Sequence, residues 1–162
     1  MSTQDLPTLP VLRLTEAVPL PACATEGAAG LDLAAALPAP LTLTPGGRTL
    51  VPTGVAVAIP EGYAGLLFAR SGLALKKGLC LANGVGLIDC DYRGEIKVAL
   101  LNTGLEPVEI APGERIAQLM LTPFLKARPI AVEQLPETAR GAGGFGSTGT
   151  APLPAPGGDG HG

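Results

Sequence analysis

The chain has 162 residues, which suits a single domain, and 46% of them are hydrophobic, which is enough for a core. Its net charge of -3 and its lack of a basic tract argue against duplex nucleic acid and against a membrane surface as partners. Three cysteines without a repeated spacing argue against a disulfide framework, and the one histidine is second-last, so a zinc site or Ser/His triad is effectively excluded. With no secretory signal and no apolar run near ~20 residues, we expect a cytoplasmic protein.

Glycine and proline dominate the organisation of the chain, with 23 glycines and 17 prolines. The longest stretches free of both, Glu95–Thr103 and Glu114–Thr122, are shorter than the ~11–12 residues of an average helix. Short strands joined by turns therefore predict an all-β sandwich or barrel. The strands expected in chain order are Val11–Leu14, Ala29–Ala35, Leu41–Thr44, Arg48–Pro52, Thr53–Ile59, Ala64–Arg70, Leu79–Ala82, Pro107–Ile110, Arg115–Phe124 and Pro129–Leu135.

Two local features complete this prediction of secondary structure. The sequence Pro-Gly-Gly at 45–47 predicts a hairpin turn between its flanking strands. Ser71–Lys77 is the one segment for which we expect a short helical turn.

The segment Asn83–Glu95 has the clearest potential for chemistry. Its first half is rich in glycine, its second half places three carboxylates around Tyr92, and an alternating apolar run follows. This pattern predicts two strands that fold back on each other at Asp89–Gly94, with bare backbone for a flat ligand. Asp89 would act as a base and Tyr92 would offer a ring face. The alternative is ordinary turn chemistry, since Asp and Gly favour tight turns in any protein.

Other segments carry weaker signals. Arg70–Ser71–Gly72 follows an apolar strand and is either a phosphate seat or a surface arginine with a helix cap. Asp32 stands between two leucines and so should face away from the core, where it is either simply exposed or holds a hydrated cation. Gln118 lies near the start of a later strand, which is a weak signal alone.

Arg140–Gly149 has the glycine spacing of a phosphate-binding loop. The lysine is missing and no helix can follow, so the nucleotide-binding P-loop is rejected. Glycine N–H groups and hydroxyls can still wrap a phosphate, and Phe145 suggests stacking on a flat ring. A plain low-complexity linker is the alternative.

Five segments in this order resemble the five motifs of the trimeric dUTP pyrophosphatases, or dUTPases, over residues 10–150. The segments are Ala29–Leu33, Arg70–Ala74, Asn83–Glu95, Gly113–Gln118 and Arg140–Gly149. The resemblance implies a jelly-roll-like β-barrel or sandwich of the β-clip type at 1–136, a flexible arm at 137–150 that closes the active site, and a disordered tail at 151–162. It implies hydrolysis of dUTP with Mg²⁺ by a homotrimer in which each site draws on three chains.

The resemblance also implies roles for single residues. Asp89 would activate the attacking water and Tyr92 would lie under the deoxyribose, leaving no room for a ribose 2′-hydroxyl. The residues that would read uracil are Asn83, the backbone at Leu87 and Ile88, and the strand near Lys97.

On the phosphate side, the resemblance implies that Arg70, Ser71 and Gly72 hold the phosphates, that Gln118 touches the phosphate chain, and that Asp32 holds a water on Mg²⁺. The arm residues would be Arg140, Phe145, Ser147 and Thr148, with Phe145 over the uracil. Three alternatives are a dCTP deaminase on the same scaffold, a non-catalytic dUTP-binding protein, and a β-sandwich interaction module. The polar clusters argue against the last.

Overall fold

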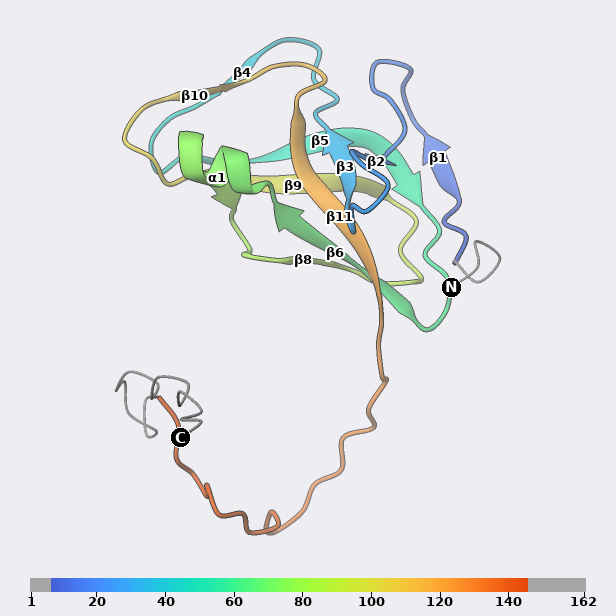
Figure 1. Ribbon diagram of the computed structural model, residues 1–162, viewed down its shortest axis with the longest axis vertical. Coiled ribbons are helices and arrows are strands. Elements are labelled where there is room, and N and C mark those ends of the chain that lie inside the picture. The colour runs from blue at the N-terminus through green and yellow to red at the C-terminus, as the bar shows by residue number, and fades with distance from the viewer. Residues whose placement is uncertain (1–6, 146–162) are drawn as a thin grey trace, which may run out of the picture. The chain divides into compact units, whose positions relative to one another are not determined.

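The structure, a computed structural model, describes residues 7–145 and contains one short helix among many strands (Figure 1). Its elements are β1 (Val11–Arg13), β2 (Ala22–Cys23), β3 (Leu31–Ala34), β4 (Leu41–Leu43), β5 (Arg48–Val57), β6 (Tyr63–Ala69), α1 (Ser71–Lys77), β7 (Leu79–Leu81), β8 (Gly86–Ile88), β9 (Glu95–Asn102), β10 (Val108–Ile110) and β11 (Arg115–Pro123). The predicted all-β class is confirmed.

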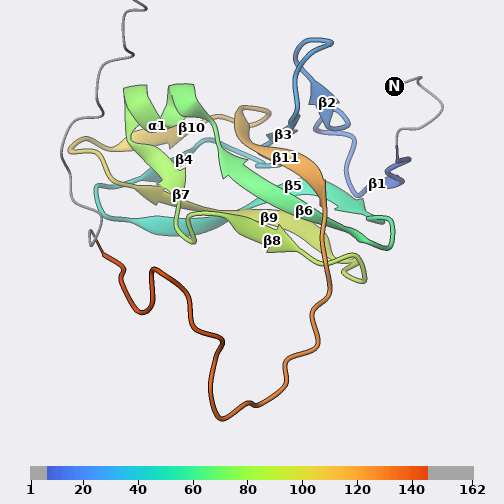
Figure 2. The same cartoon turned by 60° about the horizontal axis from the view of Figure 1, so that its bottom comes forward.

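The strands form two large antiparallel sheets and one small one. The four-stranded sheet has the order β1-β5-β9-β7, the five-stranded sheet has the order β2-β3-β11-β6-β8, and β10 pairs with β4. Helix α1 lies at one end with β4 and β10, and β1 and β2 lie at the other (Figures 1 and 2). One apolar cluster joins both large sheets, with Leu33, Leu67 and Leu119 from one and Val51 and Val98 from the other. The fold is therefore a sandwich around a single aliphatic core.

Strand β5 covers two of the predicted strands in one element of ten residues. Its register against β9 shifts between Pro52 and Ala56, which is a position where a sheet tolerates proline. Gly54 lies within the shift with φ +69°, and a Cβ there would lie 2.5 Å from a methyl group of Thr15. This irregularity bends the strand without ending it.

Two expected hairpins are wrong, although their turns exist. The turn at 45–47 forms, with Gly47 N–H donating to Thr44 O at 2.8 Å, but β4 pairs with β10 and not with β5. Likewise β8 pairs with β6, while β9 pairs with β5 and β7. Because β9 has a partner on each side, it has no free edge for β8. The segment Asp89–Gly94 therefore connects the two large sheets.

Helix α1 spans the same residues as the predicted helical turn. It ends at Gly78, whose φ of +66° and N–H bonds to Leu73 O and Ala74 O are typical of a left-handed helix end. None of the helices in the described part of the chain is long and apolar enough to cross a membrane.

The chain divides into two compact units between Lys126 and Ala127. All the strands among the described residues belong to the first unit. The strand expected at Pro129–Leu135 is absent, because within residues 7–145 no other strand pairs with this segment. Ile130 and Leu135 are 74% and 82% exposed, so these side chains gain nothing from burial that would favour a strand.

Candidate active site

Three neighbouring strands bring the first set of polar residues together. Strand β11 lies between β3 and β6, with Gln118 opposite Asp32 on one side and opposite Phe68 on the other. Arg70 follows directly after β6. The sheet therefore gathers residues that are more than eighty positions apart in the sequence.

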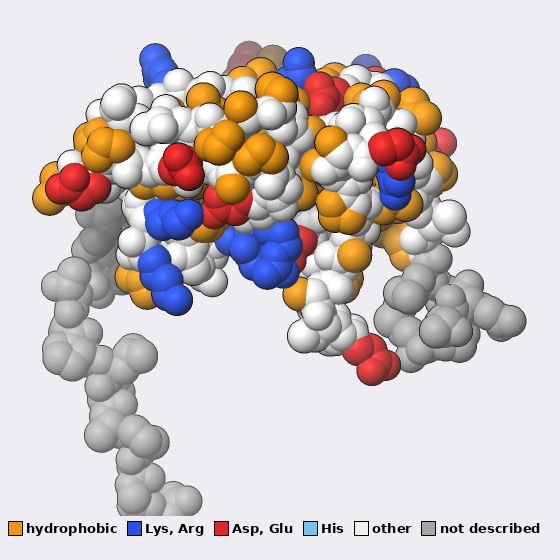
Figure 3. Space-filling view, turned by 90° about the horizontal axis from the view of Figure 1, so that it is seen from above, with side chains coloured by type: hydrophobic (Ala, Val, Ile, Leu, Met, Phe, Trp, Pro, Cys, Tyr) orange, Lys and Arg blue, Asp and Glu red, His pale blue; other side chains and the backbone are white. Residues whose placement is uncertain are grey.

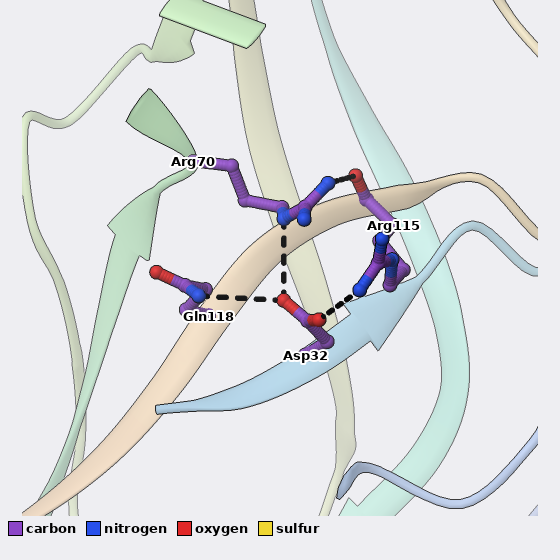
Figure 4. A network of polar contacts seen from close by, with 4 residues as sticks. All are labelled: Asp32, Arg70, Arg115 and Gln118. Atoms are coloured by element: carbon purple, nitrogen blue, oxygen red, sulfur yellow. Dashed lines mark hydrogen bonds and ion pairs between the residues drawn. The ribbon is translucent and has the colours of Figure 1, made fainter. Parts of the chain in front are cut away.

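Asp32 is the centre of this group and is only 8% exposed (Figure 4). Arg115 Nη1 donates to Asp32 Oδ2 at 2.7 Å, and Gln118 Nε2 donates to Oδ1 at 3.4 Å. Arg70 Nε lies 3.2 Å from Oδ1, as an ion pair without the alignment of a hydrogen bond. Of the two interpretations of Asp32, simple exposure is wrong, because the guanidinium groups of Arg115 and Arg70 compensate the buried charge.

A cavity of 260 Å³ opens beside this group, and we call it the basic cavity. It is lined by Arg70, Ser71, Gly72, Leu73, Lys76, Lys77 and Gln118. None of these lining residues, which all belong to the described part of the chain, is acidic, so the field of the cavity favours an anion. Figure 3 shows several Lys and Arg side chains close together, with Asp and Glu side chains among them.

Sequence reasoning missed Lys76 and Lys77 in this cavity. Both lie in the last turn of α1, and the available signal was two adjacent lysines at the end of the predicted helical turn. Lys77 Nζ also forms an ion pair of 2.8 Å with Glu114 Oε1. Burial alone would raise the pKa of Glu114, but hydrogen bonds from Lys77 and from the Ala111 N–H, with the charges of Lys77 and Arg70, lower it.

A second cavity, of 540 Å³, contains the predicted base and tyrosine, and we call it the tyrosine cavity. Its lining includes Asn83, Gly86, Leu87, Ile88, Asp89, Tyr92 and Glu95 from the predicted segment, together with Leu50, Leu67, Ile96 and Lys97. The residues proposed to read uracil, the tyrosine proposed to lie against the sugar and the proposed general base Asp89 thus line one cavity. The basic cavity shares no lining residue with it.

Two glycines allow β8 to approach β6 closely. A Cβ on Gly86 would lie 2.9 Å from Leu67 Cβ, and one on Gly65 would lie 3.3 Å from Ile88 Cβ. Because Gly86 has no side chain, it lines the tyrosine cavity with its backbone alone. Asp89 follows this strand immediately and is exposed.

The described residues do not form a metal cage. Among residues 7–145 no three His, Cys, Asp or Glu side chains are grouped to hold a metal ion. Both oxygens of Asp32 already contact nitrogen atoms of Arg and Gln side chains. This donor set does not fit a metal held directly by the chain, and it fits only a hydrated ion carried by an anionic ligand.

The predicted arm is described in part. Arg140 Nε donates to Gly143 O at 2.7 Å, and Phe145 is fully exposed with φ 48°. Both belong to the second unit, so the structure does not relate them to either cavity. Ser147 and Thr148 lie outside the described residues.

Comparison with known proteins places this geometry in a family. The dUTPase family model matches residues 16–149. The chain belongs to the dUTPase family. The deoxyuridine 5′-triphosphate nucleotidohydrolase of Desulfotalea psychrophila is 56% identical over 137 residues, covering 85% of this chain and 91% of that protein. That of Rhizobium etli is 53% identical over 147 residues, covering 88% and 94%.

Solved structures of dUTPases share the fold. A variant of the Staphylococcus bacteriophage 80alpha dUTPase with dUpNHpp has a TM-score of 0.81 at 30% identity, covering 88% of this chain and 99% of that one. A variant of the phage phi11 dUTPase from S. aureus, which reveals the coordination of a structural Mg(II) ion, has a TM-score of 0.73 at 27% identity, covering 81% and 100%. The antiparallel sandwich is thus the fold of this family.

Proposed function

We propose that the chain hydrolyses dUTP to dUMP and pyrophosphate. The observation that carries this proposal is the content of the tyrosine cavity, where an exposed carboxylate, a tyrosine ring and the backbone of β8 line the same space. A backbone edge can read a base by hydrogen bonds, the ring can cover a sugar, and the carboxylate can activate water. Family membership supports the same reaction.

Asp89 acts as the general base. It accepts a proton from water, whose oxygen attacks the α-phosphorus, and the bond from that phosphorus to the bridging oxygen breaks as pyrophosphate leaves. Such a step needs positioning and charge neutralisation more than covalent help. Gln118 contacts the phosphate chain, and Arg70, Ser71 and Gly72 hold it in the basic cavity.

When bound with the substrate, Mg²⁺ would neutralise part of the triphosphate charge, and it would keep several waters because the chain offers few direct ligands. Asp32 is the residue proposed to contact such a water. Asp32 also has a second proposed role: its ion pairs hold Arg70 and Arg115 beside the basic cavity.

The two cavities are proposed to meet between subunits of a homotrimer. Within one chain they share no lining residue, although one triphosphate must contact both groups of side chains. The arm residues Arg140, Phe145, Ser147 and Thr148 are proposed to close over the bound nucleotide, with Phe145 on the uracil. Such closure excludes water and strengthens each charge contact.

Asn83, the backbone at Leu87 and Ile88, and the strand near Lys97 are the proposed readers of uracil. In a cell this activity limits uracil in DNA and supplies dUMP for dTMP synthesis. We place it in the cytoplasm, since Cys23, Cys80 and Cys90 are free thiols.

The decisive experiment incubates the full chain with each deoxynucleoside triphosphate and with UTP, in the presence of Mg²⁺. Pyrophosphate and ammonia are measured separately. We expect pyrophosphate from dUTP alone, with no ammonia from any substrate. Ammonia from dCTP would instead identify a deaminase, and tight dUTP binding without any product would identify a binding protein.

A further inference from the structure

The exposed turn between β8 and β9 contains an unusual contact between Gly94 and the ring of Tyr92. A Cβ placed on Gly94 would lie 2.6 Å from Tyr92 Cζ and closer still to the phenol oxygen. Real Cβ atoms essentially never approach other heavy atoms so closely. The phenol therefore occupies the space that any side chain at position 94 would need.

A hydrogen bond holds the same ring from its far end. Tyr92 Oη donates to the backbone carbonyl of Glu95 at 3.1 Å, at the first residue of β9. The ring is otherwise accessible, since Tyr92 is 46% exposed. Gly94 and the carbonyl of Glu95 are thus two contacts that bear on where this accessible ring lies.

The backbone of the turn is held separately from the ring. Tyr92 N–H donates to Asp89 O at 3.1 Å, and Arg93 Nη1 donates to the carbonyls of Cys90 and Tyr92 at 2.7 and 2.8 Å. Gly94 does not have a positive φ, so alanine could adopt its backbone conformation. A methyl group at position 94 would therefore displace the exposed end of the Tyr92 side chain and leave the turn in place.

We propose that Gly94, with the Glu95 carbonyl, forms a seat that positions Tyr92 and so sets the discrimination between deoxyribose and ribose. This inference rests on the proposed function, in which the Tyr92 ring lies against the sugar. Gly94 touches no substrate atom in this account and acts only through the ring. A ring in the seat leaves no space for a 2′-hydroxyl, whereas a displaced ring opens that space.

The test is a double-mutant cycle read as ratios of kcat/KM. Gly94→Ala should lower the dUTP-to-UTP ratio by about tenfold, which is the scale of discrimination by one small group in a pocket. Tyr92→Ala should lower it at least as far. The double variant should equal Tyr92→Ala, because a glycine that acts through the ring has no effect once the ring is gone.

Two controls separate positioning from general damage. The ratio of kcat/KM for dUTP to that for dTTP reports recognition of the nucleobase and should not change in Gly94→Ala. Gly27→Ala is the matched glycine control, because no heavy atom lies within 4 Å of a Cβ built there and its φ is not positive. It should preserve both ratios.

Tyr92→Phe tests the other half of the seat and does not depend on whether Gly94→Ala folds. It keeps the ring and removes the bond to the Glu95 carbonyl, so the dUTP-to-UTP ratio should fall severalfold. An unchanged ratio in both Gly94→Ala and Tyr92→Phe, in a chain that hydrolyses dUTP, would overturn the seat. The seat would also be overturned if the fall in the dUTP-to-UTP ratio in the double variant equalled the product of the falls in the two single variants. If the unmodified chain releases no pyrophosphate from dUTP, it is the proposed function that fails.

Discussion

At the scale of single residues, Asp89 and Asp91 form an internal comparison. Both are exposed on the same turn, but only Asp89 lines the tyrosine cavity. Asp89→Asn should lower kcat for dUTP by about 10²–10⁴, the usual contribution of a general base, with little change in KM. Pyrophosphate release at saturating dUTP measures the effect.

Asp91→Asn is the matched control, because it removes the same charge from the same turn. It should keep kcat within a small factor of the unmodified chain. Equal losses in the two variants would mean that the turn needs its charge and that neither carboxylate is the base.

The residue scale also shows where sequence reasoning reaches its limit. The alternation around Asp32 correctly keeps its side chain off the apolar core face, and exposure is one of the two interpretations that follow from it. Exposure is wrong because Arg115 on β11, which pairs with β3, and Arg70, which follows β6, both contact the carboxylate. Arg115 is 83 positions away in sequence, so no local pattern could have shown that it covers Asp32.

At the scale of elements, the Lys77–Glu114 pair joins α1 to the turn before β11. The folded-state pKa of Glu114 is below its ordinary value of 4.5. The pair therefore stabilises the fold above that pH, and its contribution is lost as the pH falls through the lowered pKa. Because Lys77 is 41% exposed, we expect less than about 1 kcal/mol.

Thermal unfolding of Glu114→Gln at several pH values tests this pair. The melting temperature should be slightly lower than that of the unmodified chain near pH 7, and the difference should shrink below pH 4.5. Glu109→Gln, an exposed carboxylate on β10, is the control and should show no such dependence. A difference in melting temperature between Glu114→Gln and the unmodified chain that grows as the pH falls would contradict a stabilising Lys77–Glu114 pair.

Asn102 is the polar residue on which the end of β9 depends, and it is fully buried. Its Nδ2 donates to Leu43 O at 2.9 Å and to Glu106 O at 2.8 Å, and its Oδ1 accepts from Gly104 N–H at 2.9 Å. Asn102→Ala leaves these backbone groups without partners and should cost about 2–4 kcal/mol.

Calorimetry at one fixed protein concentration measures this loss, since assembly would shift the apparent stability. The melting temperature should fall by about 5–10 °C for a domain of this size. Thr42→Ala, at an exposed position on β4, should change it by about 1 °C or less. A comparable fall in both variants would show that Asn102 has no special role.

The positions of the strands are easier to predict from sequence than the pairing of the strands within the sheets. Alternation and turn residues predicted most of the strands, because these signals are local. Pairing is a property of distant segments, and two adjacent strands with a good turn, β8 and β9, lie in different sheets. The segment Pro129–Leu135 shows the same limit, since strand-like residues form no strand without a neighbour.

At the scale of the whole molecule, the separation of the two cavities predicts complementation. Asp89→Asn damages only the tyrosine cavity and Gln118→Ala damages only the basic cavity. If each site combines one cavity from each of two subunits, mixed trimers will contain sites in which both are intact. Random mixing in equal amounts should restore about a quarter of the normal activity.

The experiment requires that the two inactive proteins be unfolded and refolded together. Each variant refolded alone is the control and should stay inactive. No recovery in the mixture, with normal trimers by light scattering, would place a complete site within one chain.

The division of the chain at Lys126 predicts the effect of truncation. Within residues 7–145 every strand lies before it, so a chain that stops after Leu135 should fold and assemble. It should lose most activity, because the proposed arm is gone. A chain that stops after Thr150 should keep near-normal kcat/KM. Full activity in the shorter chain, or loss in the longer one, would contradict the proposed closure.

The turn between β8 and β9 joins the two large sheets, and its two chemical groups are anchored to different ones. Asp89 follows β8 in one sheet, while Tyr92 is bonded to the first residue of β9 in the other. The packing between the sheets therefore contributes to the spacing between the carboxylate and the ring, together with the Tyr92 N–H bond to Asp89 O. Buried residues such as Leu67 and Ile96, which lie in opposite sheets and also line the tyrosine cavity, become determinants of fidelity. Natural variation in the aliphatic core could thus tune the accuracy of the enzyme while every polar group around the nucleotide stays the same.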